Sequence, residues 1–159
     1  MTTRLETIYG DQLEKVLRAI PAIDRTLVGI FAADDRLPDL YERPSCYVYN
    51  SDSSKEPGEH WTCAFGNTDG SWEYWDSYGL PPLENIYQQM KSTGPIVYNK
   101  YWLQDPLSNC CSLYVIYFLY ARCNGRRLVS VLTDFKDLDF QRNDLLVNDF
   151  YKYLSTNYC

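Results

Sequence analysis

Histidine, positive charge and long apolar runs are all scarce in this chain of 159 residues. The single histidine excludes a histidine-rich metal site. The formal net charge of −6 argues against general nucleic-acid binding, because phosphate affinity comes from clustered Lys and Arg. No segment reaches the roughly 18 uninterrupted apolar residues of a membrane span, and the N-terminus has no apolar signal-peptide region. We therefore expect a protein without a membrane partner that is not secreted and resides in the cytosol or nucleus.

Cysteines in Cys-x-x-Cys pairs are also missing. The six cysteines lie at positions 46, 63, 110, 111, 123 and 159. Their spacing fits neither a zinc site nor a secreted disulfide scaffold. We expect most of these thiols to be reduced and buried as small apolar side chains, with no metal or other cofactor.

The overall composition is that of a globular protein, with 45% hydrophobic and 23% charged residues. A chain of this length can bury roughly two-thirds of its unfolded surface around one core. Because the sequence has no internal repeat or long linker, residues 1–159 are expected to form a single domain.

Short aromatic and β-branched segments, bounded by turn-forming residues, predict strands. They lie at 26–32, 45–50, 60–67, 71–77 and 96–104. The turn sequence "NTDG" between the third and fourth segments predicts a β-hairpin over 60–77, and the polar stretch at 50–60 predicts a loop. Because hairpin arms run antiparallel, we expect His60 and Asp76 at the open end to lie side by side.

Helices are predicted by apolar spacing and by capping residues at about 10–20, at 82–92 and from Asn143 onward. The segment 111–123 is apolar on every face, which predicts a central buried helix that ends at Asn124-Gly125. "RLVSVL" at 127–132 is expected to be a strand or an extended segment. Together these elements predict an α+β fold, with helices around a mostly antiparallel sheet.

Two adjacent cysteines, Cys110 and Cys111, stand at the N-terminal end of this buried helix. Unpaired N–H groups and the helix dipole favour a thiolate there. His60 is the one histidine available as a partner base, and Asp76 could hold its other ring nitrogen. Gln104, at the end of a predicted strand, could direct its side-chain amide at a developing oxyanion. Each residue alone has a commoner structural explanation, but the combination indicates nucleophilic catalysis by one of the two cysteines.

The order and spacing of these residues resemble the adenovirus-type maturation proteases (adenain), in the clan that also contains SUMO-specific proteases. "GEHW" resembles the family's G-x-H-W, "YWDSYG" its acidic strand end before an aromatic residue and Gly, and "QDPLSNCCSLY" its Q-x-P-x-S-x-x-C-G-L-F. "VGIFAADDRLPDL" is similar to the family's N-terminal stretch, so the likeness extends from about residue 28 to 122. "DSYGLPP" and "NDLLVNDFYKYL" further resemble the adenain-like proteases of virophages, adintoviruses and Maverick/Polinton elements.

The resemblance bears on which cysteine is the nucleophile. Aligned on Gln104 and Pro106, the family's nucleophile falls on Cys111. The spacing of the SUMO proteases would select Cys110 instead, but Pro106 and Ser108 favour the viral register.

Two departures from the family pattern concern the site. Ser112 stands where the family commonly has Gly, so the sequence does not determine the backbone geometry of the oxyanion site. Asp76 stands where human-type adenain has Glu, a change that the clan accommodates.

The resemblance implies a papain-like-clan cysteine protease of the adenain type, with the nucleophile on the buried helix. Cys111 would attack the substrate, His60 would move the proton, Asp76 would hold the imidazole and Gln104 would stabilise the oxyanion. The implied function is a viral endopeptidase that cleaves capsid or core precursor proteins after small residues such as Gly during virion maturation. Its implied location is the virion and the infected host cell. The family also implies an activating peptide, whereas the net charge of −6 argues against activation by DNA.

Two alternative functions remain open at this stage. One is a protease of the same clan that removes SUMO or ubiquitin. The other is a catalytically inactive, capsid-associated binding module, for which Ser112 and the cysteine-rich site are the support.

Overall fold

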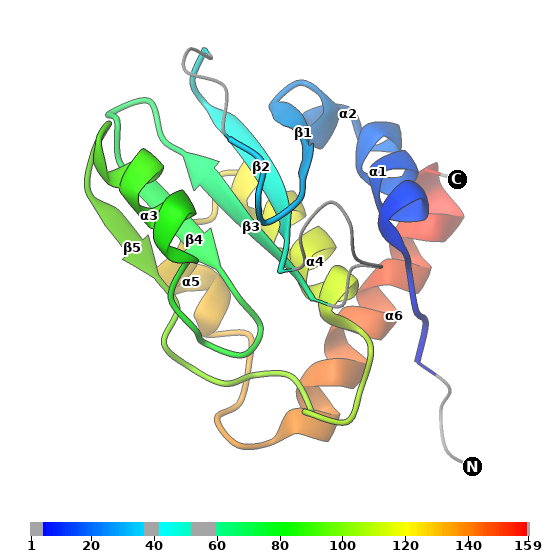
Figure 1. Cartoon of the computed structure of the whole chain (residues 1–159). Helices are drawn as coiled ribbons and strands as arrows, with labels where there is room; N and C mark the ends of the chain where they lie inside the picture. Colours follow the sequence, from blue (N-terminus) through cyan, green and yellow to red (C-terminus); the bar gives the residue numbers. More distant parts are fainter. Residues whose placement is uncertain (1–4, 37–41, 52–59, 159) are drawn as a thin grey trace.

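A five-stranded sheet forms the centre of the computed structural model, which describes residues 5–36, 42–51 and 60–158 (Figure 1). The predicted loop at 50–60, the end of "VGIFAADDRLPDL" and Cys159 lie wholly or mainly outside these residues. The strands follow one another in the order β1 (Leu27–Phe31), β2 (Ser45–Asn50), β3 (Trp61–Gly66), β4 (Trp72–Trp75) and β5 (Ile96–Tyr98). The central strands β2, β3 and β4 are antiparallel, and each edge strand pairs in parallel with its neighbour. The predicted α+β class is confirmed.

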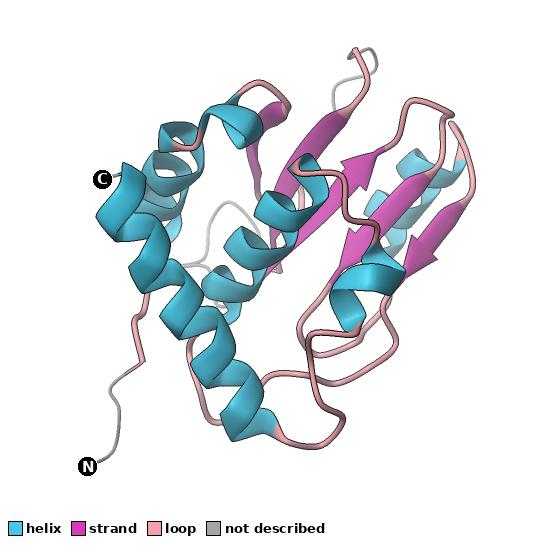
Figure 2. Cartoon of the chain, turned by 180° about the vertical axis from the view of Figure 1, so that it is seen from behind, coloured by secondary structure: helices cyan, strands magenta, loops and turns pink. Residues whose placement is uncertain are grey.

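Helices cover both faces of the sheet (Figures 1 and 2). α3 (Glu84–Lys91) connects the parallel strands β4 and β5 and covers one face, where its Ile86 and Met90 belong to one buried cluster with Tyr47 and Tyr74. On the other face, α4 (Cys111–Cys123) packs against β3, and α6 (Phe140–Tyr158) and α1 (Gly10–Ala19) lie outside it. In the described part of the chain, no helix combines the length and the apolar composition needed to cross a membrane.

The predicted hairpin is formed by β3 and β4. Its turn closes with bonds from Asn67 N to Ser71 O (2.8 Å) and from Gly70 N to Asn67 O (3.1 Å), and Gly70 has a φ of 90°. Such a positive φ strains any residue with a Cβ, so glycine suits this turn. The strands pair Cys63 with Trp75, a register that continues toward His60 at the open end.

The structure corrects the prediction for "RLVSVL". This segment is the short helix α5 (Leu128–Leu132), not a strand. Glu73 Oε1 accepts the N–H of Leu128 at 2.9 Å, so a carboxylate from β4 binds the first turn of α5. A run of six apolar and polar residues does not distinguish a strand from a helix, and here a contact distant in sequence decides.

Other boundaries differ from the predictions. α2 (Pro21–Asp24) was not predicted, and α6 begins at Phe140, three residues before Asn143. β5 ends at Tyr98, well before residue 104, because the chain then turns around the end of β4. There the N–H groups of Leu103 and Gln104 donate to Ser77 O at 2.8 and 3.1 Å.

A buried ion pair joins the sheet to α4. Arg122 Nε donates to Glu73 Oε2, and the guanidinium also donates to Asn67 Oδ1. The guanidinium lies 4.3 Å from the centre of the Phe65 ring. Both charged side chains are at most 10% exposed, so the loss of either one leaves an uncompensated buried charge.

Glu73→Ala is therefore expected to lower the free energy of unfolding by about 3–5 kcal/mol, as is typical of a broken buried ion pair. Asp24→Ala, which removes the exposed partner of Arg18, should cost less than ~1 kcal/mol. Urea denaturation followed by circular dichroism measures both values. Equal, small losses in the two variants would contradict the assigned role of the buried pair.

Candidate active site

The open end of the hairpin brings together His60 and Asp76. His60 Nε2 lies 2.7 Å from Asp76 Oδ1. The Asp76 carboxylate also accepts the Tyr78 N–H at 2.8 Å. The side chain of Asn99 holds the backbone of Asp76: it accepts from Asp76 N at 2.9 Å and donates to Asp76 O at 2.6 Å. Asp76 is thus fixed on both its side chain and its backbone, and it orients the imidazole through Nε2.

Cys111 is the first residue of α4, and Cys110 precedes it as the N-cap. The Cys110 side chain is fully buried and does not line the cleft, and its Sγ lies 3.2 Å from Ser108 Oγ. Burial raises the pKa of the Cys110 thiol, which disfavours its thiolate. Cys111, in contrast, lines the same cleft as His60, and its side chain is close enough to the His60 ring to raise the pKa of that ring. Of the two adjacent cysteines, the geometry therefore favours Cys111 as a nucleophile.

The His60 ring is held as a cation at neutral pH. Burial alone would lower its pKa, but the hydrogen bond to Asp76, the negative charge of Asp76 and the nearby Cys111 side chain raise the pKa of His60 to about 9. Because Nε2 binds Asp76, the other ring nitrogen, Nδ1, is left for the thiol. An imidazolium beside a thiol at a helix N-terminus is the environment that favours a reactive thiolate.

Gln104 is fully buried and held at both ends of its amide. Ser77 Oγ donates to its Oε1 at 2.6 Å, while its Nε2 donates to Ser108 O and Ser108 Oγ at 3.1 and 3.2 Å. The residue does line the cleft beside Cys111. Its amide nitrogen is thus bonded within its own loop, whereas the sequence suggested an amide directed at an oxyanion.

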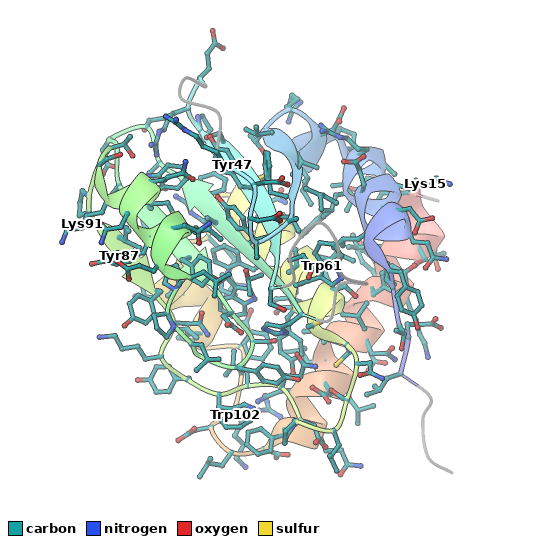
Figure 3. The ribbon with its side chains drawn as sticks, viewed as in Figure 1. Lys15, Tyr47, Trp61, Tyr87, Lys91 and Trp102 are labelled. Atoms are coloured by element: carbon teal, nitrogen blue, oxygen red, sulfur yellow. The ribbon has the colours of Figure 1, made fainter. Side chains whose placement is uncertain are left out.

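The cleft around these groups has a volume of about 460 Å³. Tyr78 stacks on His60 with ring centres 4.6 Å apart, and its other neighbour Trp102 meets it edge-on at 5.7 Å. Trp61 packs on the start of α1, where a Cβ on Gly10 would lie 3.0 Å from its ring (Figure 3). The cleft is lined by Thr7, Ile8, Tyr9, His60, Trp61, Tyr78, Gln104, Pro106, Ser108, Asn109 and Cys111.

Asp144, on α6, is a supporting residue that sequence analysis missed. Its Oδ1 accepts the Tyr114 hydroxyl at 2.6 Å and the Asp105 N–H at 3.4 Å, and burial raises its pKa. The carboxylate thereby holds the start of the loop that leads to Cys111. No local signal marks it, because the contact forms only when α6 packs behind α4.

Asn99 and Tyr78 were missed as well. Tyr78 could have been found by continuing the hairpin register, which places it opposite His60. Asn99 follows β5, and its contact with Asp76 depends on the parallel pairing of β4 and β5. The described residues contain no cluster of His, Cys, Asp or Glu suited to a metal ion.

Comparisons with known proteins show which solved structures have a similar fold. No family model and no curated protein matches the sequence. The chain is similar to a crystal structure of the pS273R protease of African swine fever virus (ASFV), with a TM-score of 0.64 and 14% identity over 89% of this chain and 66% of that one. A Se-Met crystal structure of the same protease matches with a TM-score of 0.50 and 20% identity over 67% of this chain and 44% of that one. The chain thus has the fold of a viral protease while spanning about two thirds or less of its length.

Since His60 is the only histidine, NMR reports its titration without overlap. We expect the imidazole to titrate near pH 9 in the wild type and well below that value in Asp76→Asn, which removes a charge that raises the pKa. Asp137→Asn, at an exposed site, should leave the titration unchanged.

The sign of the linked stability follows from the same shift. A raised pKa stabilises the fold fully below the ordinary histidine value of 6.5, and this stabilisation is lost as the pH rises toward 9. An imidazole that titrates near 6.5 in both proteins would contradict the assigned geometry.

Proposed function

We propose that this chain is a cysteine endopeptidase with Cys111 as the nucleophile. The observation that carries the proposal is that His60 and Cys111 line the same cleft while the buried Asp76 carboxylate holds the His60 ring from behind at 2.7 Å. The likeness of the fold to a viral protease supports it.

In the proposed mechanism, the Cys111 thiolate attacks the scissile carbonyl carbon. His60 then gives its Nδ1 proton to the leaving amine, while Asp76 keeps the ring oriented through Nε2. A water molecule activated by His60 releases the acyl group and restores the thiol. The Cys111 backbone N–H and the Gln104 amide would stabilise the oxyanion. For this, the N–H of Gln104 Nε2 that Ser108 Oγ now accepts would be donated to the oxyanion instead.

Ser112, the departure from the family's Gly, is compatible with this mechanism. Its side chain is fully buried on α4 and is not part of the cleft wall. Its hydroxyl finds no hydrogen-bond partner among the described residues. A serine here thus does not obstruct the substrate, which weakens the case for an inactive binding module.

For the substrate, we propose an extended segment of a capsid or core precursor protein, cut after a small residue such as Gly during virion maturation. Tyr78, Trp61 and Pro106 border the cleft near Cys111, which favours small side chains at the cut. The proposed setting is a virion and its infected host cell, with an adenain-type activating peptide as a further partner. Neither SUMO nor ubiquitin has a specific structural observation in its favour.

Iodoacetamide labelling near pH 6, mapped by mass spectrometry, tests the nucleophile. An ordinary thiol with a pKa of about 8.5 is scarcely ionised at that pH. We expect Cys111 to be labelled much faster than Cys110, and His60→Ala to abolish the difference. Cys110→Ala, the matched control, should keep the fast site. Fast labelling of Cys110 instead would indicate that Cys110 is the nucleophile, as the spacing of the SUMO proteases predicts.

Peptide hydrolysis tests the function directly. Extended peptides with Gly at the cut should be cleaved by the wild type, and cleavage should be lost in Cys111→Ala, whose fold is checked by circular dichroism. Substrates made of SUMO or ubiquitin form the comparison arm. Preference for these conjugates would favour the modifier-protease alternative, and a complete lack of hydrolysis with a slow Cys111 would favour the binding module.

Gln104→Ala should lower kcat by about 10²–10³ with little change in KM, since an oxyanion donor acts mainly in the transition state. Ser108→Ala keeps the Gln104 amide and removes one of its two acceptors, the hydroxyl, while the backbone carbonyl stays, so its kcat should be retained. Steady-state kinetics on the cleaved peptide separate the two parameters. A change in KM alone for Gln104→Ala would show that the residue only binds substrate.

A further inference from the structure

A second pair of thiols lies at the other end of α4, roughly 18 Å along the helix from Cys111 at the usual rise per residue. Cys123 is the last residue of α4, and Cys46 lies on β2. Thr26 Oγ1 is 3.4 Å from the Sγ atoms of both cysteines. The two thiols are also close enough for each to change the pKa of the other. Three groups that are distant in sequence thus converge on one point.

The two thiols differ in character. The neighbouring Cys46 thiol lowers the pKa of Cys123 to about 7 against the effect of burial, with help from Thr26 and the charges of Arg122 and Arg25. Cys46 is completely buried, and the neighbouring Cys123 thiol and this burial raise its pKa. Cys123 is therefore suited to attack an oxidant, and Cys46 is suited to resolve the product.

Cys123 can be reached from solvent. It is half-buried and lines a pocket of about 330 Å³ together with Phe65, Arg122 and Arg127. Asp69 also lines this pocket and Glu73 pairs with Arg122, so the two arginines are partly balanced, but the charge of Arg122 still favours the Cys123 thiolate. Cys63 and Cys110 are fully buried and line neither this pocket nor the cleft.

We propose that Cys46 and Cys123 are a site of reversible oxidation by hydroperoxides, which converts the two thiols into a disulfide between β2 and α4. The Cys123 thiolate attacks one peroxide oxygen, the O–O bond breaks, and hydroxide leaves as water after protonation. The Cys46 thiol then attacks the sulfenic sulfur of Cys123 and releases a second water. Two thiols and one hydrogen peroxide thus give one disulfide and two waters, and the two electrons pass from sulfur to oxygen. A small thiol reductant reverses the step.

This pair is independent of the proposed protease chemistry. The disulfide would fix the C-terminal end of α4 to the sheet, whereas Cys111 occupies the N-terminal end. The inference therefore holds whether or not the chain cleaves peptides, and its test needs no substrate.

The test is hydrogen peroxide treatment of the full chain carrying Cys111→Ala, which removes the competing thiol of the cleft. We expect the intact mass to fall by two hydrogens, a digest without reductant to contain a peptide that links Cys46 to Cys123, and dithiothreitol to restore both thiols. Cys46→Ser should stop the reaction at a sulfenic acid on Cys123, trapped by dimedone. Cys63→Ser is the matched control, with a buried strand thiol removed, and should still form the link.

The outcomes decide the proposal. Oxidation of Cys123 to sulfinic or sulfonic acid without a link to Cys46 would overturn it, as would a link to any other cysteine or no oxidation at Cys123. Because the link is sought first in the protein that retains both thiols, this result does not depend on whether Cys46→Ser folds.

Discussion

The burial of α4 is the constraint on which the rest of the structure depends. The helix is apolar on nearly all faces, so the sheet, α1 and α6 must enclose it. Phe118, near its middle, stacks on Trp75 of β4 with ring centres 4.9 Å apart. With that register set, the N-terminal end of α4 emerges at the open end of the β3–β4 hairpin. The same packing that removes apolar surface from water therefore brings Cys111 to His60.

Position along and around this helix determines the chemistry of its thiols. Cys111 faces an imidazolium in a cleft, and Cys123 faces Cys46 beside two arginines. Cys110 and Cys63 are enclosed by the core, where burial raises the pKa of both thiols. The cysteine thiols of this chain thus differ in reactivity, because desolvation and neighbouring charge differ from one thiol to the next.

Polar contacts complete the site from elements that are distant in sequence. Asn99 holds the backbone of Asp76, and Ser77 holds the Gln104 amide. Asp144 reaches from α6 to the loop before α4. These groups are buried and paired, so each limits the movement of a residue in the cleft. The site is consequently supported by the C-terminal half of the chain as well as by the hairpin.

The sequence by itself determined the α+β class, the hairpin, the buried helix and the approach of His60 to Asp76, because turn residues and apolar patterns act locally. Only the tertiary structure decided that α5 is a helix, that Cys111 and not Cys110 faces the cleft, and that Asp144 supports it. It also brought Cys46 to Cys123. Each of these features rests on contacts between residues far apart in the chain, which form only when the sheet and helices pack together.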